Sequence, residues 1–172
     1  SQLALAPNFV QEQFNYLHKH CEENIQKNKH IINQLNAYAC WMWHVSLLSL
    51  ANRPRESLLG QLEDYCFELK LLYVNDKKNS KARKDGRFIP LSDFFIKALQ
   101  NYTAFLKQIT SAYGSFLKHV FAKKKITIND LFGKVIDSKD ILPMSARQWQ
   151  SRKIKLLPLS RNWVNAYMQG IL

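Results

Sequence analysis

The sequence has few glycines and few cysteines, and each shortage excludes a class of function. There are five glycines and three cysteines among 172 residues. The sequence has no Walker loop, dinucleotide-binding glycine pattern, serine-hydrolase elbow or HExxH zinc motif. Cys21, Cys40 and Cys66 are odd in number and widely spaced, which disfavours a disulfide framework or a cysteine-based zinc site and suits a reducing cytosol.

Long apolar runs and acidic residues are also scarce. The most apolar window, residues 37–51, contains His44 and is too short to span a bilayer, and we expect neither a membrane span nor a signal peptide. The sequence has 25 lysines and arginines but only 13 acidic residues, which gives a net charge of +12. This charge favours a polyanionic partner, with nucleic acid first and an anionic membrane surface second.

Apolar residues recur at helical spacing along most of the chain, which at 47% hydrophobic content can bury one substantial core. A wide apolar stripe that includes Leu47 and Leu48 predicts a central helix, and Ser92-Asp93 predicts the start of a long helix that is interrupted near Gly114. The expected helices cover residues 10–25, 31–48, 92–120, 127–132, 145–156 and 161–169.

A period-two pattern at residues 67–74 predicts a strand, and residues 87–91 predict a short returning strand after the Asp85-Gly86 turn signal. The loop between them, residues 76–86, is strongly basic. The predicted fold is therefore mainly α with a small antiparallel β-hairpin, an α+β protein. We expect residues 1–29 to form an N-terminal helix that packs on or leads into a domain of residues 30–172.

The candidate functional residues are cationic. Arg53 lies at a predicted helix junction and Arg147 in the first turn of a predicted helix, so these two guanidinium groups and the hairpin lysines can converge on one phosphate. No acidic cluster suited to magnesium is present, and His18, His20 and Cys21 have the wrong spacing to share a helix face as metal ligands. We therefore expect neither a metal nor another cofactor.

The order of these motifs resembles the catalytic domain of tyrosine site-specific recombinases, the phage-integrase family. The resemblance covers residues 34–172. It comprises Arg53-Pro54-Arg55-Glu56, an apolar strand, the lysine-bearing hairpin and Arg87-Phe88-Ile89-Pro90-Leu91. A long helix, the helix-initial Arg147 and Trp163-Val164 with Tyr167-Met168 follow.

The resemblance implies roles for individual residues. Arg53 and Arg147 would be the catalytic arginines, Glu56 the acid that supports Arg53, and Lys77 the catalytic lysine, with Lys78 and Lys81 as alternatives. Met144 stands where the family has the histidine of its His-x-x-Arg box. Tyr167 stands at a family packing position, so the nucleophilic tyrosine is missing, and we expect the chain to be truncated before it and inactive as it stands.

The implied reaction of the intact enzyme is DNA strand cleavage and rejoining through a 3′-phosphotyrosyl intermediate, for DNA integration or recombination by a mobile element. The implied partners are double-stranded DNA and further copies of the chain assembled on DNA, a tetramer in the family, and no membrane. The implied location is the bacterial cytoplasm, at the nucleoid. The residues expected to contact DNA are Lys78, Lys81, Arg83, Lys84, Arg87, Lys123, Lys124, Lys125, Arg152 and Lys153, and Lys155 extends the last cluster.

Two alternatives belong to other classes. A non-catalytic basic helical module, acting as an accessory or regulatory DNA-binding factor, would show the same charge without the chemistry. An amphipathic protein of the membrane surface would use the same cations against anionic lipid.

Overall fold

The computed structural model describes residues 31–50, 59–74, 86–137 and 154–171, together with Glu12, Asn15, Tyr16, Lys19 and Glu23. These five single residues are helical and fall in the predicted helix 10–25, and Lys19 Nζ lies 4.0 Å from Glu23 Oε1. The expected domain boundary at residues 29 and 30 lies outside the described residues.

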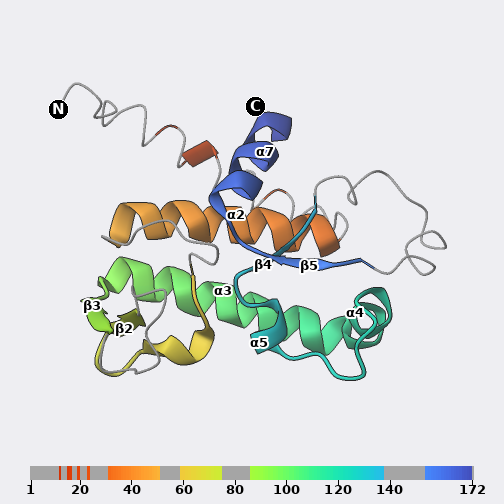
Figure 1. The fold of residues 1–172 in the computed structure, drawn as a ribbon, viewed down its shortest axis with the longest axis horizontal. Coiled ribbons are helices and arrows are strands. Elements are labelled where there is room, and N and C mark those ends of the chain that lie inside the picture. The colour runs from red at the N-terminus through yellow and green to blue at the C-terminus, as the bar shows by residue number, and fades with distance from the viewer. Residues whose placement is uncertain are drawn as a thin grey trace.

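Helices and small antiparallel sheets alternate along the chain, which confirms an α+β fold (Figure 1). The helices are α2 (Ile31–Ser49), η1 (Leu62–Asp64), α3 (Asp93–Ala112), α4 (Gly114–Val120), α5 (Ile128–Leu131) and α7 (Arg161–Ile171). The strands are β1 (Tyr65–Cys66), β2 (Leu71–Val74), β3 (Arg87–Pro90), β4 (Lys134–Ile136) and β5 (Leu156–Pro158).

Helix α2 lies beside α3 and also contacts β4, so it is the central helix that the wide apolar stripe predicts (Figure 1). Its last turn differs from the prediction, because Leu47 and Leu48 are 44% and 56% exposed. Val45, which belongs to the predicted stripe, is buried, and so is Ser46. Since successive residues of a helix are about 100° apart, the next two side chains point away from the core.

The predicted strand 67–74 is wrong in its first half. Strand β1 ends at Cys66, residues 67–70 form a turn with Lys70 at a φ of 52°, and β2 begins at Leu71. The alternating polarity of residues 67–70 therefore does not indicate a strand. These residues form a turn in which Leu69 is 70% exposed. The sheet order is β1-β2-β3, and the predicted β2–β3 hairpin is confirmed, with Val74 opposite Arg87.

Two contacts hold the turn of residues 67–70 against the segment that leads into α3. The Leu91 amide donates to the Lys70 carbonyl over 2.8 Å. The Lys70 ammonium donates to Asp93 Oδ1 over 2.7 Å. The β1–β2 turn is thus attached to the start of α3.

The predicted start and interruption of the long helix are confirmed. Ser92 caps α3 by accepting a hydrogen bond from the Phe95 amide over 3.1 Å. The helix ends at Ala112, and α4 begins at Gly114. The buried stripe of α3 is apolar or aromatic and consists of Phe95, Ile96, Ala98, Leu99, Tyr102, Phe105, Leu106 and Ile109.

The short helix predicted at residues 127–132 is also confirmed, as α5. Thr127 and Asp130 form a capping box, in which the Thr127 amide donates to Asp130 Oδ2 over 2.8 Å. Gly133 follows at a φ of 67°, in the left-handed region that favours glycine.

Strands β4 and β5 were not predicted, and their pairing contradicts a helix that continues to Leu156. Val135 pairs with Leu157, and Ile136 with Leu156, in an antiparallel ladder. Hydrogen bonds to a distant strand therefore override the local pattern at Leu156. The predicted helix start at residues 145–148 lies outside the described residues, whereas the last predicted helix is confirmed as α7.

One buried polar side chain joins α2 to this second sheet. Asn36, which is fully buried, donates from Nδ2 to the Ile136 carbonyl over 2.9 Å and accepts from the Ile136 amide at Oδ1 over 2.7 Å. The Trp163 indole N–H of α7 also donates to the Ile136 carbonyl, over 3.1 Å. The backbone of Ile136 thus connects α2, β4 and α7.

We expect Asn36→Ala to lower the free energy of unfolding by about 2–4 kcal/mol, because it leaves the buried Ile136 amide without a partner and opens a cavity. Urea denaturation measures the change. Asn101→Ala, at an exposed position of α3, is the matched control and should stay within about 0.5 kcal/mol of the parent. Equal losses in the two variants would contradict this role for Asn36.

Candidate nucleic-acid interface

The end of the β2–β3 hairpin is the first part of the candidate interface. Val74 and Arg87 form the last pair of the ladder, so in the sequence residues 75–86 connect the ends of two paired strands. Five lysines and arginines and only two aspartates occur in this basic segment. Arg87 begins β3 and is exposed. Arg87 therefore puts a positive charge at this end of the sheet.

The predicted catalytic residues Arg53, Lys77 and Arg147 and the supporting Glu56 lie outside the described residues, so their convergence on one phosphate stays a prediction. The same holds for the family position occupied by Met144. The DNA-contacting candidates outside the described residues are Lys78, Lys81, Arg83, Lys84, Arg152 and Lys153. Arg87, Lys123, Lys124 and Lys125 are the described candidates.

A second cationic region lies at the end of α4. The Ile154 amide donates to the Val120 carbonyl over 2.9 Å, so the backbone that precedes Lys155 lies against the end of α4. The Lys123 amide donates to the Lys118 carbonyl over 2.9 Å, so both flanks of the helix end carry cations. This α4 basic surface consists of the exposed residues Lys118, Lys123, Lys124, Lys125 and Lys155.

Asp130 holds one lysine of the α4 basic surface in place. Lys123 Nζ lies 3.4 Å from Asp130 Oδ1. The hydrogen bond from the Thr127 amide is the main cause that lowers the pKa of Asp130, and Lys123 and the Thr127 hydroxyl lower it further. Across residues 86–137 and the other described segments, no carboxylate forms an ion pair with Lys124 or Lys125. These two ammonium groups are therefore available to an external anion.

Sequence reasoning identified Lys123, Lys124 and Lys125 but did not predict that Lys155 joins them. The run of three lysines is visible in the sequence, and so is the separate cluster around Lys155. Their proximity depends on the backbone contact between Ile154 and Val120, which has no local signal. Lys118 could have been found by its helical position, because it lies in the last turn of α4 beside His119.

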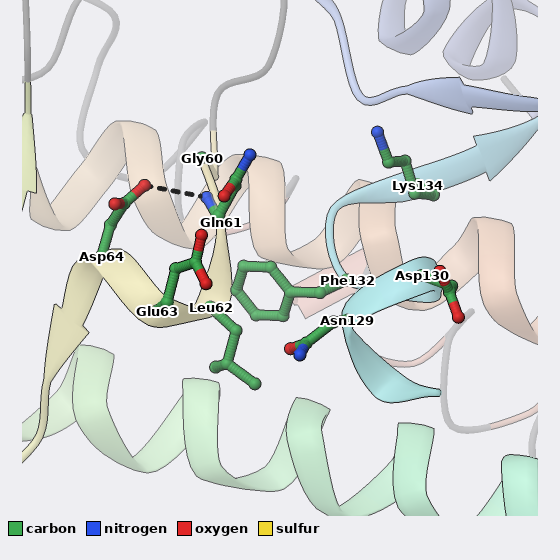
Figure 2. A pocket seen from close by; sticks show the side chains of 9 residues that line it. All are labelled: Gly60, Gln61, Leu62, Glu63, Asp64, Asn129, Asp130, Phe132 and Lys134. Atoms are coloured by element: carbon green, nitrogen blue, oxygen red, sulfur yellow. Dashed lines mark hydrogen bonds between the residues drawn. The ribbon is translucent and has the colours of Figure 1, made fainter. Parts of the chain in front are cut away.

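A cavity of about 650 Å³ lies between η1 and the α5–β4 segment, close to Asp130. Figure 2 shows Glu63 and Asp64 on one side of it and Lys134 on β4 on another. Asp64 accepts a hydrogen bond from the Gln61 amide over 3.2 Å. Three carboxylates, including that of Asp130, give the cavity a mainly acidic lining, so it does not suit a phosphate, and it contains none of the predicted catalytic residues.

Two described tyrosines, Tyr65 and Tyr102, are buried in the core and are unsuited to nucleophilic attack. Tyr65 donates to the Leu59 carbonyl over 2.7 Å, and the Tyr102 hydroxyl accepts from the Gly133 amide over 3.2 Å. Burial raises the pKa of both phenols well above their ordinary value. Tyr167 is half-buried and stacks on Trp163 with ring centroids 4.9 Å apart, in agreement with a packing role.

His44 is half-buried on α2 and contacts the backbone of its own helix. Its Nδ1 lies 2.8 Å from the Cys40 carbonyl, and burial is the main cause that lowers the His44 pKa. Burial raises the pKa of the Cys40 thiol to about 12. In the part of the chain that the structure describes, no three His, Cys, Asp or Glu residues group as metal ligands.

Comparison with known proteins finds no relative: no family model, no curated protein and no solved structure matches this chain. Among the helices of the described segments, none combines the length and the apolar character needed to cross a membrane.

We expect Asp130→Asn to reduce stability at neutral pH and to have a smaller effect in acid. Because folding lowers the pKa of the Asp130 carboxyl, its ionised form stabilises the folded state at pH values above the ordinary pKa of 3.8. This contribution disappears as the pH falls through the lower pKa of the folded state. Urea midpoints of the parent and the variant at pH 7 and at about pH 3 measure the change. Lys123→Ala is the control and should keep most of the pH dependence, because the Thr127 amide is the main cause. A difference between parent and Asp130→Asn that does not shrink in acid would contradict the role of the ionised carboxylate.

Proposed function

We propose that this chain binds double-stranded DNA as a tyrosine-recombinase catalytic domain, and that the intact protein cleaves and rejoins DNA strands for integration or recombination. The observation that carries the proposal is the β2–β3 hairpin. In the chain, the basic segment 75–85 follows Val74, which pairs with Arg87 of β3, and β3 leads through Leu91 into the Ser92-capped helix α3. This is the element order that the resemblance implies.

In the proposed reaction, a tyrosine hydroxyl loses its proton to solvent as its oxygen attacks the scissile phosphorus, and the bond to the 5′-oxygen breaks, leaving a 3′-phosphotyrosyl link. Arg53 and Arg147 stabilise the negative charge of the pentacoordinate phosphorus. Lys77, or its alternatives Lys78 and Lys81, donates a proton to the departing 5′-oxygen. We assign this tyrosine to none of the matched positions, since Tyr167 stacks on Trp163.

The DNA contact combines two cationic regions. The basic segment and Arg87 supply one, and the α4 basic surface supplies the other, with Arg152 and Lys153 next to Lys155 in the sequence. Lysine and arginine contacts to phosphate release counterions, so such an interface binds DNA with a strong salt dependence. We place the protein in a bacterial cytoplasm at the nucleoid and propose that copies assemble on the DNA.

We expect the double variant Lys124→Ala, Lys125→Ala to bind duplex DNA more weakly than the parent. If both lysines neutralise phosphates, the slope of log K against log salt becomes shallower by about 2, from a loss of about 0.9 per contact. Fluorescence anisotropy with a labelled duplex over a range of salt concentrations measures the slope. Lys124→Arg, Lys125→Arg keeps both charges and is the matched control. An unchanged slope in the alanine variant would remove the α4 basic surface from the interface.

The catalytic part is tested with the natural full-length gene product and a nicked suicide duplex, which traps a covalent protein–DNA adduct. We expect the adduct to form and to be lost in Arg53→Ala and in Arg147→Ala, because each removes charge stabilisation worth several kcal/mol at the transition state. Denaturing electrophoresis detects the adduct. Lys97→Ala, at an exposed position of α3, is the control and should leave adduct formation unchanged. Duplex binding without any adduct would instead indicate the non-catalytic DNA-binding module.

A further inference from the structure

A cluster of side chains between α2 and α7 contains three donors of the kinds that soft metal ions favour. Cys40 and His44 both belong to α2, and Met168 belongs to α7 (Figure 1). The Cys40 Sγ lies 3.9 Å from His44 Nδ1 and 3.9 Å from Met168 Sδ. Residues four apart on a helix share a face, so the first contact is local, whereas the second joins two distant parts of the chain.

These two separations match those of ligands that share one ion. A metal in a protein site lies about 2.3 Å from a thiolate sulfur and about 2.0–2.1 Å from an imidazole nitrogen, so two such ligands at a trigonal or tetrahedral angle are about 3.6–4.0 Å apart. Both contacts of the Cys40 sulfur fall in this range. The sulfur is therefore placed to share an ion with either neighbour.

His44 changes the position of its proton when it becomes a ligand. Its Nδ1 lies 2.8 Å from the Cys40 carbonyl oxygen, which can only accept, so Nδ1 is the donor of this hydrogen bond. A ligating Nδ1 carries no proton, and the neutral ring then holds its proton on Nε2. Cys40 is buried whereas His44 and Met168 are half-buried, so these two residues form the more exposed side of the cluster.

The donor set favours a soft monovalent cation over zinc. Zinc takes cysteine, histidine and carboxylate ligands, whereas thiolate and thioether together select Cu(I). In the described segments, no carboxylate groups with Cys40 and His44. Burial raises the pKa of the Cys40 thiol to about 12, so a thiolate at this position needs a cation beside it. A thiolate with Cu(I) has no net charge and is less costly to bury than the positive charge that a divalent ion would leave.

We propose that Cys40, His44 and Met168 bind one Cu(I) ion at the contact between α2 and α7. The ion replaces the proton of the thiol, which is released to solvent, and the copper stays monovalent. Because two ligands belong to α2 and one to α7, the bound ion crosslinks the last helix to the central helix. No metal was expected from the sequence, because the contact between Cys40 and Met168 has no local signal. The proposal is independent of the proposed DNA binding.

The test is an anaerobic titration of the full chain with Cu(I) held by a chromophoric chelator, whose absorbance reports the copper that the protein removes. Met168→Leu keeps the size and apolar character of the side chain and should weaken the tightest binding at least about ten-fold, because even the loss of an outer-shell partner of a metal costs about 10- to 100-fold. Cys40→Ala should abolish this binding. Cu(I) should raise the thermal midpoint of the parent and not that of Cys40→Ala.

Cys66→Ser is the matched control, because Cys66 is a half-buried cysteine of β1, outside the cluster. It should leave the tightest Cu(I) binding unchanged. Circular dichroism checks that each variant is folded, and Met168→Leu decides alone if Cys40→Ala is not. Cu(I) binding by Met168→Leu that is as tight as that of the parent would show that the cluster is not the site. A loss in Cys66→Ser as large as that in Cys40→Ala would overturn the proposal as well.

Discussion

The pairing of Asn36 with the backbone of Ile136 is the interaction on which the arrangement of the core depends. A helix satisfies its own backbone, so α2 has no main-chain groups with which to hold a strand in register. The Asn36 amide replaces them, since it offers one donor and one acceptor with the spacing of a neighbouring strand residue. Because Trp163 donates to the same carbonyl, α7 is positioned by the same residue. These hydrogen bonds fix the relative positions of α2, β4 and α7 more closely than apolar burial alone would.

The sequence predicted those parts of the fold whose signals are local. Ser92 accepts a hydrogen bond from the Phe95 amide and the Thr127 amide donates one to Asp130, each within one helical turn, and Gly133 adopts the backbone conformation that its lack of a side chain permits. The β2–β3 hairpin was predictable because the apolar alternation and the Asp85-Gly86 signal lie in one short stretch. In each case the residue and its partner are only a few positions apart, or belong to a single hairpin.

The missing parts depend on distant partners. Strand β5 exists because Leu156 and Leu157 pair with β4, and nothing within a few residues indicates it. Residues 67–70 alternate in polarity as a strand does, yet they form a turn. For the candidate interface, the lysine clusters were visible as composition, but the proximity of Lys155 to the end of α4 required the contact between Ile154 and Val120. The roles of Arg53, Lys77 and Arg147 come from motif order, and their relative positions stay predictions.

The contacts of Lys70 have a mechanical consequence. The turn it occupies is attached to the start of α3 by a backbone hydrogen bond to Leu91 and by the ion pair with Asp93. The hairpin is therefore braced at its base, while its other end carries the basic segment. A force applied at that far end passes through β2 and β3 into α3, which packs along α2 (Figure 1). The attachment of the β1–β2 turn to α3 thus sets the position of the sheet relative to the two longest helices.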